Sequence, residues 1–354
     1  MELFLLLGFL AIGSFIYFDH QDDDDDMDDT TDDGTDTVDG AGGGDDDDDD
    51  DGDDDGGDDD GTDTVDGAGG GTDTVDGAGG DDDDDDDSIE FDTEITGTVG
   101  ADSIDGTTGN DLIDGGPGDD TIRASGGDDG VLGGTGDDSV VGNSGDDTIF
   151  GESGEDSIFG RGGDDALYGG ANDDVISGGS GNDFIWGSVG DDELSGDEGN
   201  DTILGMQGAD TMDGGEGDDV IVGYFDTDDD ITNGDVSDAE SIDGGAGADI
   251  LWAGSGDTVT GGLGADDFIT GTYVEETEAP VITDFAAGED VLTVIVDDAA
   301  TGDITFAEGD PDEALVYADG VLVARVAGAF GSITEADVAV ITVDDMDTRY
   351  ASIS

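Results

Sequence analysis

A nine-residue period runs without a slip through the middle of the chain and limits the fold more than any other feature. Fourteen consecutive blocks begin at Gly97 and end at Val222, as in GGSGNDFIW at residues 178–186. Position 6 is Asp and position 8 is Ile, Val, Leu or Met in all 14 blocks, while positions 1 and 4 are each Gly in 13 of them. A short fixed period of this kind predicts a solenoid, in which each repeat packs only against its neighbours.

The pattern within one block predicts a tight turn followed by a short strand. Strand side chains alternate, so in a three-residue strand at positions 7–9 only the aliphatic residue at position 8 points inward. Glycine suits a turn that needs positive φ or close approach of backbone, and Asn172, the exception at position 4, tolerates a left-handed conformation best. Two blocks then make one coil with a strand on each side. We therefore expect an all-β fold, a parallel β-roll or β-solenoid whose coils lie about 4.8 Å apart.

This geometry stacks the position-6 aspartates in two rows, one along each edge of the roll. The first row contains Asp102, Asp120, Asp138, Asp156, Asp174, Asp192 and Asp210, the second contains Asp111, Asp129, Asp147, Asp165, Asp183, Asp201 and Asp219, and degenerate blocks add Asp249 and Asp266. Carboxylates about 5 Å apart repel one another strongly unless a cation lies between them. Ca²⁺ takes six to eight oxygen ligands from carboxylates and carbonyls, whereas Mg²⁺ prefers a small octahedral shell. We predict several calcium ions at these aspartates; a calcium-free, Gly-rich solenoid is the alternative.

The blocks resemble the calcium-binding nonapeptide of RTX (repeats-in-toxin, haemolysin-type) proteins, G-G-x-G-x-D-x-U-x. The resemblance implies that each ion lies between successive coils on one edge, held by position-6 Asp side chains and by backbone carbonyls of the Gly-rich turns. The segment GADDFI…PVITDFAAGEDVL resembles the region that follows the repeats in many RTX proteins. In that family the far C-terminus carries an uncleaved signal for type I secretion, with which the tail DMDTRYASIS is compatible.

The charge and the rare residues exclude several classes of function. The chain has 102 Asp plus Glu against 4 Lys plus Arg, a formal net charge of −98, so it repels nucleic acid and anionic lipid headgroups. It has no Cys and a single His, His20, which excludes thiolate metal sites and HExxH zinc sites and disfavours a Ser-His-Asp triad. Close Asp pairs occur everywhere and carry no information about a glycosidase. We therefore expect no enzymatic activity.

Two regions before the repeats have contrasting compositions. Residues 1–18 include the uncharged segment LFLLLGFLAIGSFIYF at 3–18, which we interpret as a membrane anchor, with an export signal or a buried core element as alternatives. Residues 19–87 contain 36 Asp and three copies of GTDTVDGAGG. This composition cannot bury enough apolar surface to fold, so we expect a disordered acidic spacer, or alternatively a brush that accumulates calcium weakly.

The remaining boundaries follow from the breaks in the period. We expect the RTX-like β-roll over residues 88–222, an acidic insertion loop over 223–243 and degenerate repeats over 244–272. The DTDDD cluster of the loop is either solvated or holds one further ion. Residues 273–354 contain strand-like runs around an Asp-Gly turn signal, which predicts an antiparallel β cap over the open end of the roll.

Together these features predict a calcium-binding protein that is secreted or attached to the bacterial surface and that folds in high extracellular calcium. The alternative is a surface-anchored structural or adhesion protein in which calcium only makes the rod rigid. Calcium is the one predicted ligand. Membrane contact is expected only through residues 3–18, and the sequence identifies no protein or glycan partner.

Overall fold

The computed structural model describes residues 91–223, 239–272, 274, 278–296, 302–309, 312–329 and 331–342. The predictions for the anchor or signal at 3–18, the acidic spacer at 19–87, the DTDDD cluster and the secretion signal in the tail lie outside these residues. Among the residues that are described, no helix is long and apolar enough to span a bilayer.

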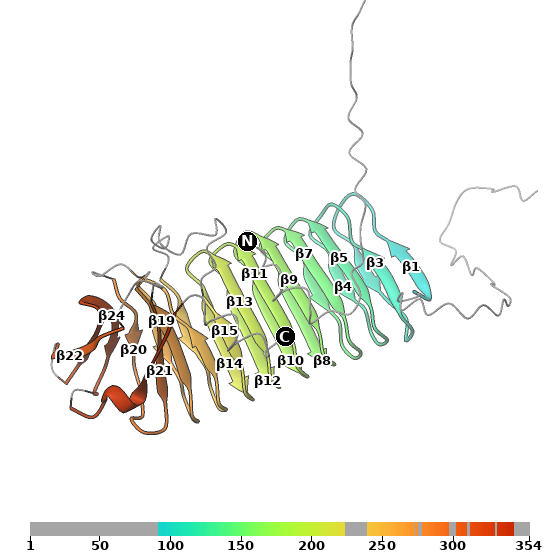
Figure 1. The fold of residues 1–354 in the computed structure, drawn as a ribbon. Helices are drawn as coiled ribbons and strands as arrows, with labels where there is room; N and C mark the ends of the chain where they lie inside the picture. Colours follow the sequence, from blue (N-terminus) through green and yellow to red (C-terminus); the bar gives the residue numbers. More distant parts are fainter. Residues whose placement is uncertain are drawn as a thin grey trace, which may run out of the picture. The chain divides into compact units, whose positions relative to one another are not determined.

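Apart from one short 3-10 helix, the regular structure of the described residues consists of strands, which form two long sheets (Figure 1). The 12-stranded sheet contains, in spatial order, β1 (Thr93–Thr96), β3 (Asp111–Asp114), β5 (Gly130–Thr135), β7 (Thr148–Ser153), β9 (Ala166–Ala171), β11 (Phe184–Val189), β13 (Thr202–Gln207), β15 (Val220–Val222), β17 (Ile250–Trp252), β19 (Asp267–Gly271), β21 (Val291–Val296) and β25 (Val338–Thr342). The 13-stranded sheet contains β2 (Ser103–Asp105), β4 (Thr121–Arg123), β6 (Ser139–Val141), β8 (Ser157–Gly162), β10 (Val175–Ser180), β12 (Glu193–Glu198), β14 (Thr211–Glu216), β16 (Ser241–Asp243), β18 (Thr258–Thr260), β20 (Val281–Ile282), β24 (Val321–Val326), β23 (Ala314–Ala318) and β22 (Ile304–Glu308).

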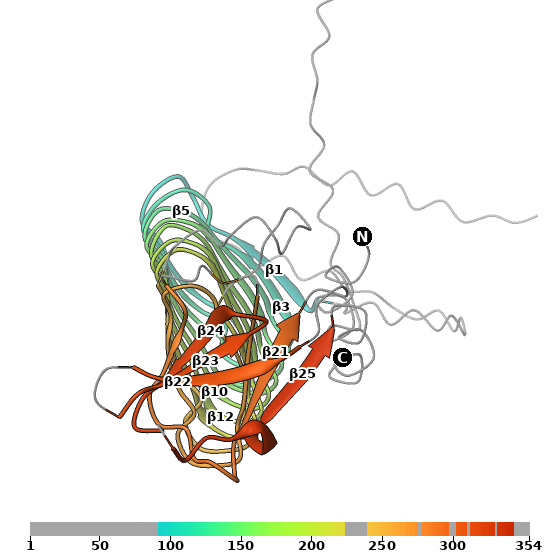
Figure 2. The ribbon, with the colours of Figure 1, turned by 60° about the vertical axis from the view of Figure 1, so that its left-hand side comes forward.

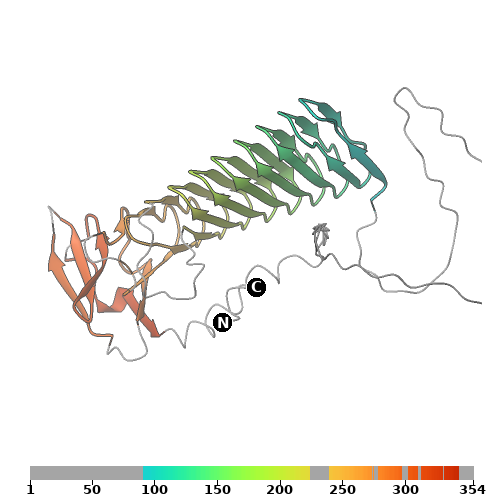
Figure 3. The same ribbon diagram turned by 90° about the horizontal axis from the view of Figure 1, so that it is seen from above.

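Odd-numbered and even-numbered strands alternate between the two sheets, so two nonapeptide blocks make one coil, as the ladder of strands in Figure 3 shows. Neighbouring strands of the array pair in parallel between residues one coil apart, such as Ile158 with Ile176 and Ile176 with Leu194. The predicted parallel β-roll is confirmed. The insertion after β15 leaves the ladder unbroken, because Val220 pairs with Ile250 across it.

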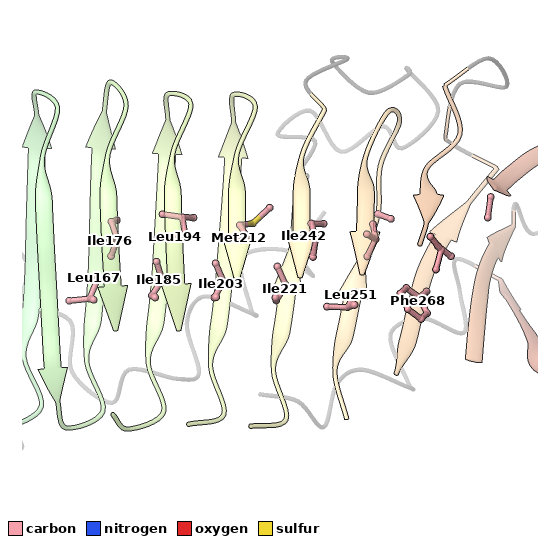
Figure 4. Packing of buried hydrophobic residues seen from close by; sticks show 14 of the residues in the cluster. Leu167, Ile176, Ile185, Leu194, Ile203, Met212, Ile221, Ile242, Leu251 and Phe268 are labelled. Atoms are coloured by element: carbon pink, nitrogen blue, oxygen red, sulfur yellow. The ribbon is translucent and has the colours of Figure 1, made fainter. Parts of the chain in front are cut away.

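The core is a file of position-8 side chains contributed alternately by the two sheets (Figure 4). All 14 of these side chains are buried, and Ile104 at the N-terminal end is the most accessible, at 8% exposure. Ile242, Leu251, Val259 and Phe268 continue the file beyond the insertion. Because each strand contributes one inward residue, no coil has a core of its own, and each depends on the coils beside it.

The central strands are longer than the sequence predicts. β5 and β7 to β14 each contain six residues and continue from positions 7–9 through positions 1–3 of the next block. Position 2 adopts a left-handed conformation within these longer strands, even where it is not glycine. The φ values are 74° at Glu152, 84° at Arg161 and 86° at Met206. Non-glycine residues in this region carry strain of about 1–3 kcal/mol each.

The C-terminal region differs in part from the predicted antiparallel unit (Figure 2). β20, β21 and β25 extend the parallel ladders of the roll, and only β22, β23 and β24 pair antiparallel. The hairpin between β23 and β24 turns at Asp319 and Gly320, which both have positive φ, as a two-residue turn requires. A short 3-10 helix, η1 (Glu335–Asp337), leads into β25. The parallel and antiparallel strands of this region have similar apolar runs, so the sequence pattern does not indicate which strands pair in parallel.

Candidate metal sites

The position-6 aspartates form one hydrogen-bonded ladder along each edge of the roll. The backbone N–H of Asp129 donates to Oδ1 of Asp147 at 2.9 Å, and the N–H of Asp147 donates to Oδ1 of Asp165 at 2.8 Å. The same link joins Asp138 to Asp156 at 2.8 Å on the other edge. Each carboxylate therefore reaches back to the coil before it. Fifteen of the 16 predicted residues expose 3% or less of their surface, and Asp102 is half-buried.

The second carboxylate oxygen has no such donor through most of the array. Oδ2 is buried and accepts no hydrogen bond in Asp120, Asp129, Asp138, Asp147, Asp156, Asp165, Asp174, Asp183, Asp192, Asp201, Asp219 and Asp249. A buried anionic oxygen without a donor or a counter-ion is strongly unfavourable. Such an oxygen, repeated once per coil on each edge, is suited to bind a cation.

Other oxygens converge on the same space. A methyl group built on Gly151, at position 1, would lie 2.5 Å from Oδ2 of Asp156 and 2.6 Å from the carbonyl oxygen of Gly169 one coil later. For Gly133 the matching distances, to Asp138 and Gly151, are 2.8 and 2.9 Å. Neither glycine has positive φ, so glycine is favoured at this position because a side chain would fill the space between the two oxygens. Ala124, in the block of Asp129, is the exception.

The environment disfavours ionised carboxylates when no cation is present. Burial raises the pKa of Asp147 to about 8 and the pKa values of Asp174 and Asp183 to about 7. The hydrogen bond from the preceding aspartate opposes each shift, and neighbouring acids in the same ladder add to it. Either protons or cations must therefore balance the charge of the ladders.

A second ladder, which the sequence analysis missed, runs beside the first at position 5. Oδ1 of Asp164 accepts the N–H of Asn182 at 2.7 Å, and Oδ1 of Asn182 accepts the N–H of Asn200 at 3.0 Å. These side chains are exposed and point forward to the next coil. The available signal was the composition of position 5, which is Asp or Asn in 11 of 14 blocks.

The two ladders differ in whether their side chains must carry a charge. Asn serves as an acceptor at position 5, so an amide oxygen is sufficient for a link of this kind between coils. An Asn at position 6 would also offer an NH₂ group to the nearby carbonyl. Position 6 is nevertheless Asp in all 14 blocks. The donor set at position 6 consists of oxygens with negative charge and fits Ca²⁺. Among the described residues no three carboxylate or imidazole groups gather around one point, so an ion held here would also need other oxygens, such as backbone carbonyls.

Three further acids, Glu240, Asp257 and Asp290, occupy position 6 in turns where the period is broken. The N–H of Glu240 donates to Oδ1 of Asp257 at 3.2 Å, and the N–H of Asp266 donates to Oδ1 of Asp290 at 3.2 Å. Each acid precedes an inward aliphatic residue by two positions, as Asp290 precedes Leu292. That spacing could have identified them without the nine-residue count.

Comparisons with known proteins agree with this geometry. Residues 96–131, 132–167, 159–194, 168–203, 195–230 and 236–268 match the model of the RTX calcium-binding nonapeptide repeat. The crystal structure of extracellular lipase LipA from Serratia marcescens is similar over 66% of this chain and 40% of the lipase chain, with 16% identity and a TM-score of 0.28. The chain thus spans less than half of the lipase, and a score this low supports no further argument. No curated protein matches the chain.

Proposed function

Because the array consists of RTX calcium-binding nonapeptide repeats, which bind several calcium ions, we propose that calcium folds this protein after export to the bacterial exterior. The observation that carries the proposal is the row of buried Oδ2 atoms without donors along each edge. The ligands are the position-6 aspartates with such an oxygen, together with carbonyl oxygens of the Gly-rich turns. The array then has a structural role, and no reaction is assigned to it.

Calcium acts on the balance between repulsion and packing. Without it, each coil stacks further carboxylates onto the edges of a chain whose formal net charge is already −98. This repulsion opposes the small apolar gain of one inward side chain per strand. An ion between coils removes the repulsion locally and stabilises only the folded state, so folding becomes linked to calcium concentration. In a cell interior poor in free calcium the repeats remain unfolded, which suits export.

Circular dichroism of the full chain tests this function. In chelator the spectrum should lack a strong β signal, and millimolar Ca²⁺ should produce one that chelator reverses. Mg²⁺ at the same concentration is the control and should produce a much smaller change, because its shell is small and it retains water. A spectrum that is unchanged by calcium, or that responds equally to both ions, would overturn the proposal.

For the location of the protein, the proposal has two forms: a freely secreted protein, or a surface-anchored structural or adhesion protein. The apolar segment at 3–18, followed by the acidic stretch at 19–87, favours the anchored form. Cell fractionation separates the two. Recovery in the membrane pellet with an intact N-terminus supports the anchor, and recovery in the culture medium supports secretion.

A further inference from the structure

The first two turns of the array differ from all central turns in how they satisfy the position-6 carboxylate. Oδ2 of Asp102 accepts the backbone N–H of Thr98 at 2.6 Å and the Thr98 hydroxyl at 2.8 Å. The backbone N–H of Thr107 donates to Oδ2 of Asp111 at 2.5 Å, and the Thr107 hydroxyl donates to Oδ1 at 3.0 Å. Neither aspartate is among those whose Oδ2 is buried without a donor.

The same backbone N–H group has another partner in later turns. At position 2 of the next two turns on the edge of Asp111, the N–H of Ser125 donates to the carbonyl of Gly142 and that of Asn143 to the carbonyl of Gly160, both at 3.0 Å. Those residues have positive φ, at 90° and 84°. Thr98 and Thr107 do not adopt positive φ, and their N–H groups turn into their own loops instead.

The position of the carboxylate oxygen Oδ2 also differs between the first turn and the next turn on the same edge. A methyl group on Gly97 would lie 3.2 Å from Oδ2 of Asp102, whereas one on Gly115 would lie 2.8 Å from Oδ2 of Asp120. The oxygen of the first turn therefore lies farther from the space that the central turns leave between Oδ2 and the next carbonyl. A calcium ion at Asp102 or Asp111 would have to displace charge-assisted hydrogen bonds from an N–H and a hydroxyl. Those donors also present positive dipole ends to the ion.

We propose that Thr98 and Thr107 replace calcium in the first coil, so that residues 97–114 close without metal. Asp102 and Asp111 are then capping residues and not calcium ligands, although their repeats match the same pattern as the others. The calcium-dependent part of the array begins at Asp120. This inference rests on the proposed function, because it concerns which turns take up the ions. Its consequence is an array that binds fewer ions than it has repeats and whose N-terminal end is closed by protein contacts.

A matched pair of single substitutions on one edge tests the assignment. Asp111→Asn and Asp147→Asn each remove one negative charge from the same ladder, the first in the N-terminal coil and the second in a coil whose position-1 residue is glycine. The number of calcium ions per chain is measured by equilibrium dialysis and elemental analysis on the full-length protein at saturating calcium. We expect Asp147→Asn to lower the number by at least one and Asp111→Asn to leave it unchanged. An equal decrease in both variants would overturn the inference while leaving calcium binding itself intact.

A gain-of-site variant covers the case in which Asp111→Asn does not fold. Thr98→Gly together with Thr107→Gly removes both hydroxyls and lets position 2 adopt the left-handed conformation of the central turns. The double variant should bind at least one more ion than the natural chain. An unchanged number in this variant would contradict the inference. Absence of bound calcium from the natural chain would refute the proposed function instead, so the two failures are distinguishable.

Discussion

Replacing Asp165 by Asn changes Oδ2, the carboxylate oxygen that we propose binds calcium, and preserves Oδ1 as an amide oxygen. The amide oxygen can still accept the N–H of Asp147, a bond of 2.8 Å. Only Oδ2, which is buried and has no donor, becomes an NH₂ group. That group faces the space shared with the carbonyl oxygen of Gly178, to which it can donate. The substitution thus removes the proposed cation ligand and leaves the link between coils in place.

The expected magnitude follows from two opposing effects. Burial raises the pKa of Asp165 from 3.8 to about 6, so its ionised form costs the metal-free fold about 3 kcal/mol at neutral pH, which the amide avoids. In calcium at 100 times the dissociation constant, loss of one site costs about 2.7 kcal/mol. The two effects nearly cancel in the calcium-loaded protein. The distinguishing quantity is therefore the dependence of unfolding free energy on calcium, which should fall by about 1.4 kcal/mol per tenfold calcium for each ion lost.

Asp164→Asn is the matched control. Asp164 is exposed, belongs to the position-5 ladder and accepts the N–H of Asn182 at 2.7 Å through Oδ1. Asn already occupies the same position in Asn182 and Asn200, so the exchange should be tolerated. It removes the same single charge. We expect the calcium dependence to be unchanged and the stability to shift by no more than about 0.5 kcal/mol.

Urea unfolding at a series of calcium concentrations and constant ionic strength measures this dependence. The slope of unfolding free energy against the logarithm of calcium concentration gives the number of ions released. Asp165→Asn should reduce that number by at least one, and Asp164→Asn should not change it. Equal slopes in both variants would refute the argument that the second oxygen at position 6 binds calcium.

Three further outcomes follow from the structure. In chelator, acid should favour the metal-free roll, because Asp147 and Asp174 have folded pKa values of about 8 and 7, above the ordinary 3.8. The stabilisation from their protonation is complete below about pH 4 and is lost as pH rises through 7 to 8. A β signal in circular dichroism at pH 4.5 that is absent at pH 8.5 would confirm this sign. Met206→Gly should raise stability in urea by about 1 kcal/mol because φ is 86° there, and a loss would contradict the strain argument. Ile185→Ala, at a fully buried core position, should lower the unfolding free energy by about 2–5 kcal/mol in calcium, and a loss below about 1 kcal/mol would show that the file of position-8 residues does not carry the core.

The architecture of the array could be predicted because a strict period leaves few solutions. One invariant aliphatic residue per nine requires a short strand with one inward side chain, and the turn glycines require coils of two blocks. The stacking of position-6 aspartates follows from the same count. The buried file from Ile104 to Phe268 confirms the period-based assignment of the core.

Several contacts could not be predicted because they depend on conformation and not on spacing. The direction of each carboxylate, back for Asp147 and forward for Asp146, is set by turn geometry that a consensus does not show. The terminal threonines differ from central residues in φ, which the nine-letter pattern leaves open. Glu240 and Asp290 were missed because the insertion and the later loops shift the count, although the ladder itself continues through them.

Crystals of the calcium-loaded protein would test the central claim most directly, through anomalous difference density at a wavelength that enhances calcium scattering. The structure predicts a peak 2.3–2.6 Å from Oδ2 at coils such as those of Asp138, Asp147 and Asp165, where that oxygen has no donor. No peak is expected at Asp102 or Asp111, where threonine donors occupy the carboxylate. Central coils without calcium density, in which Oδ2 instead accepts a hydrogen bond from protein, would contradict the account.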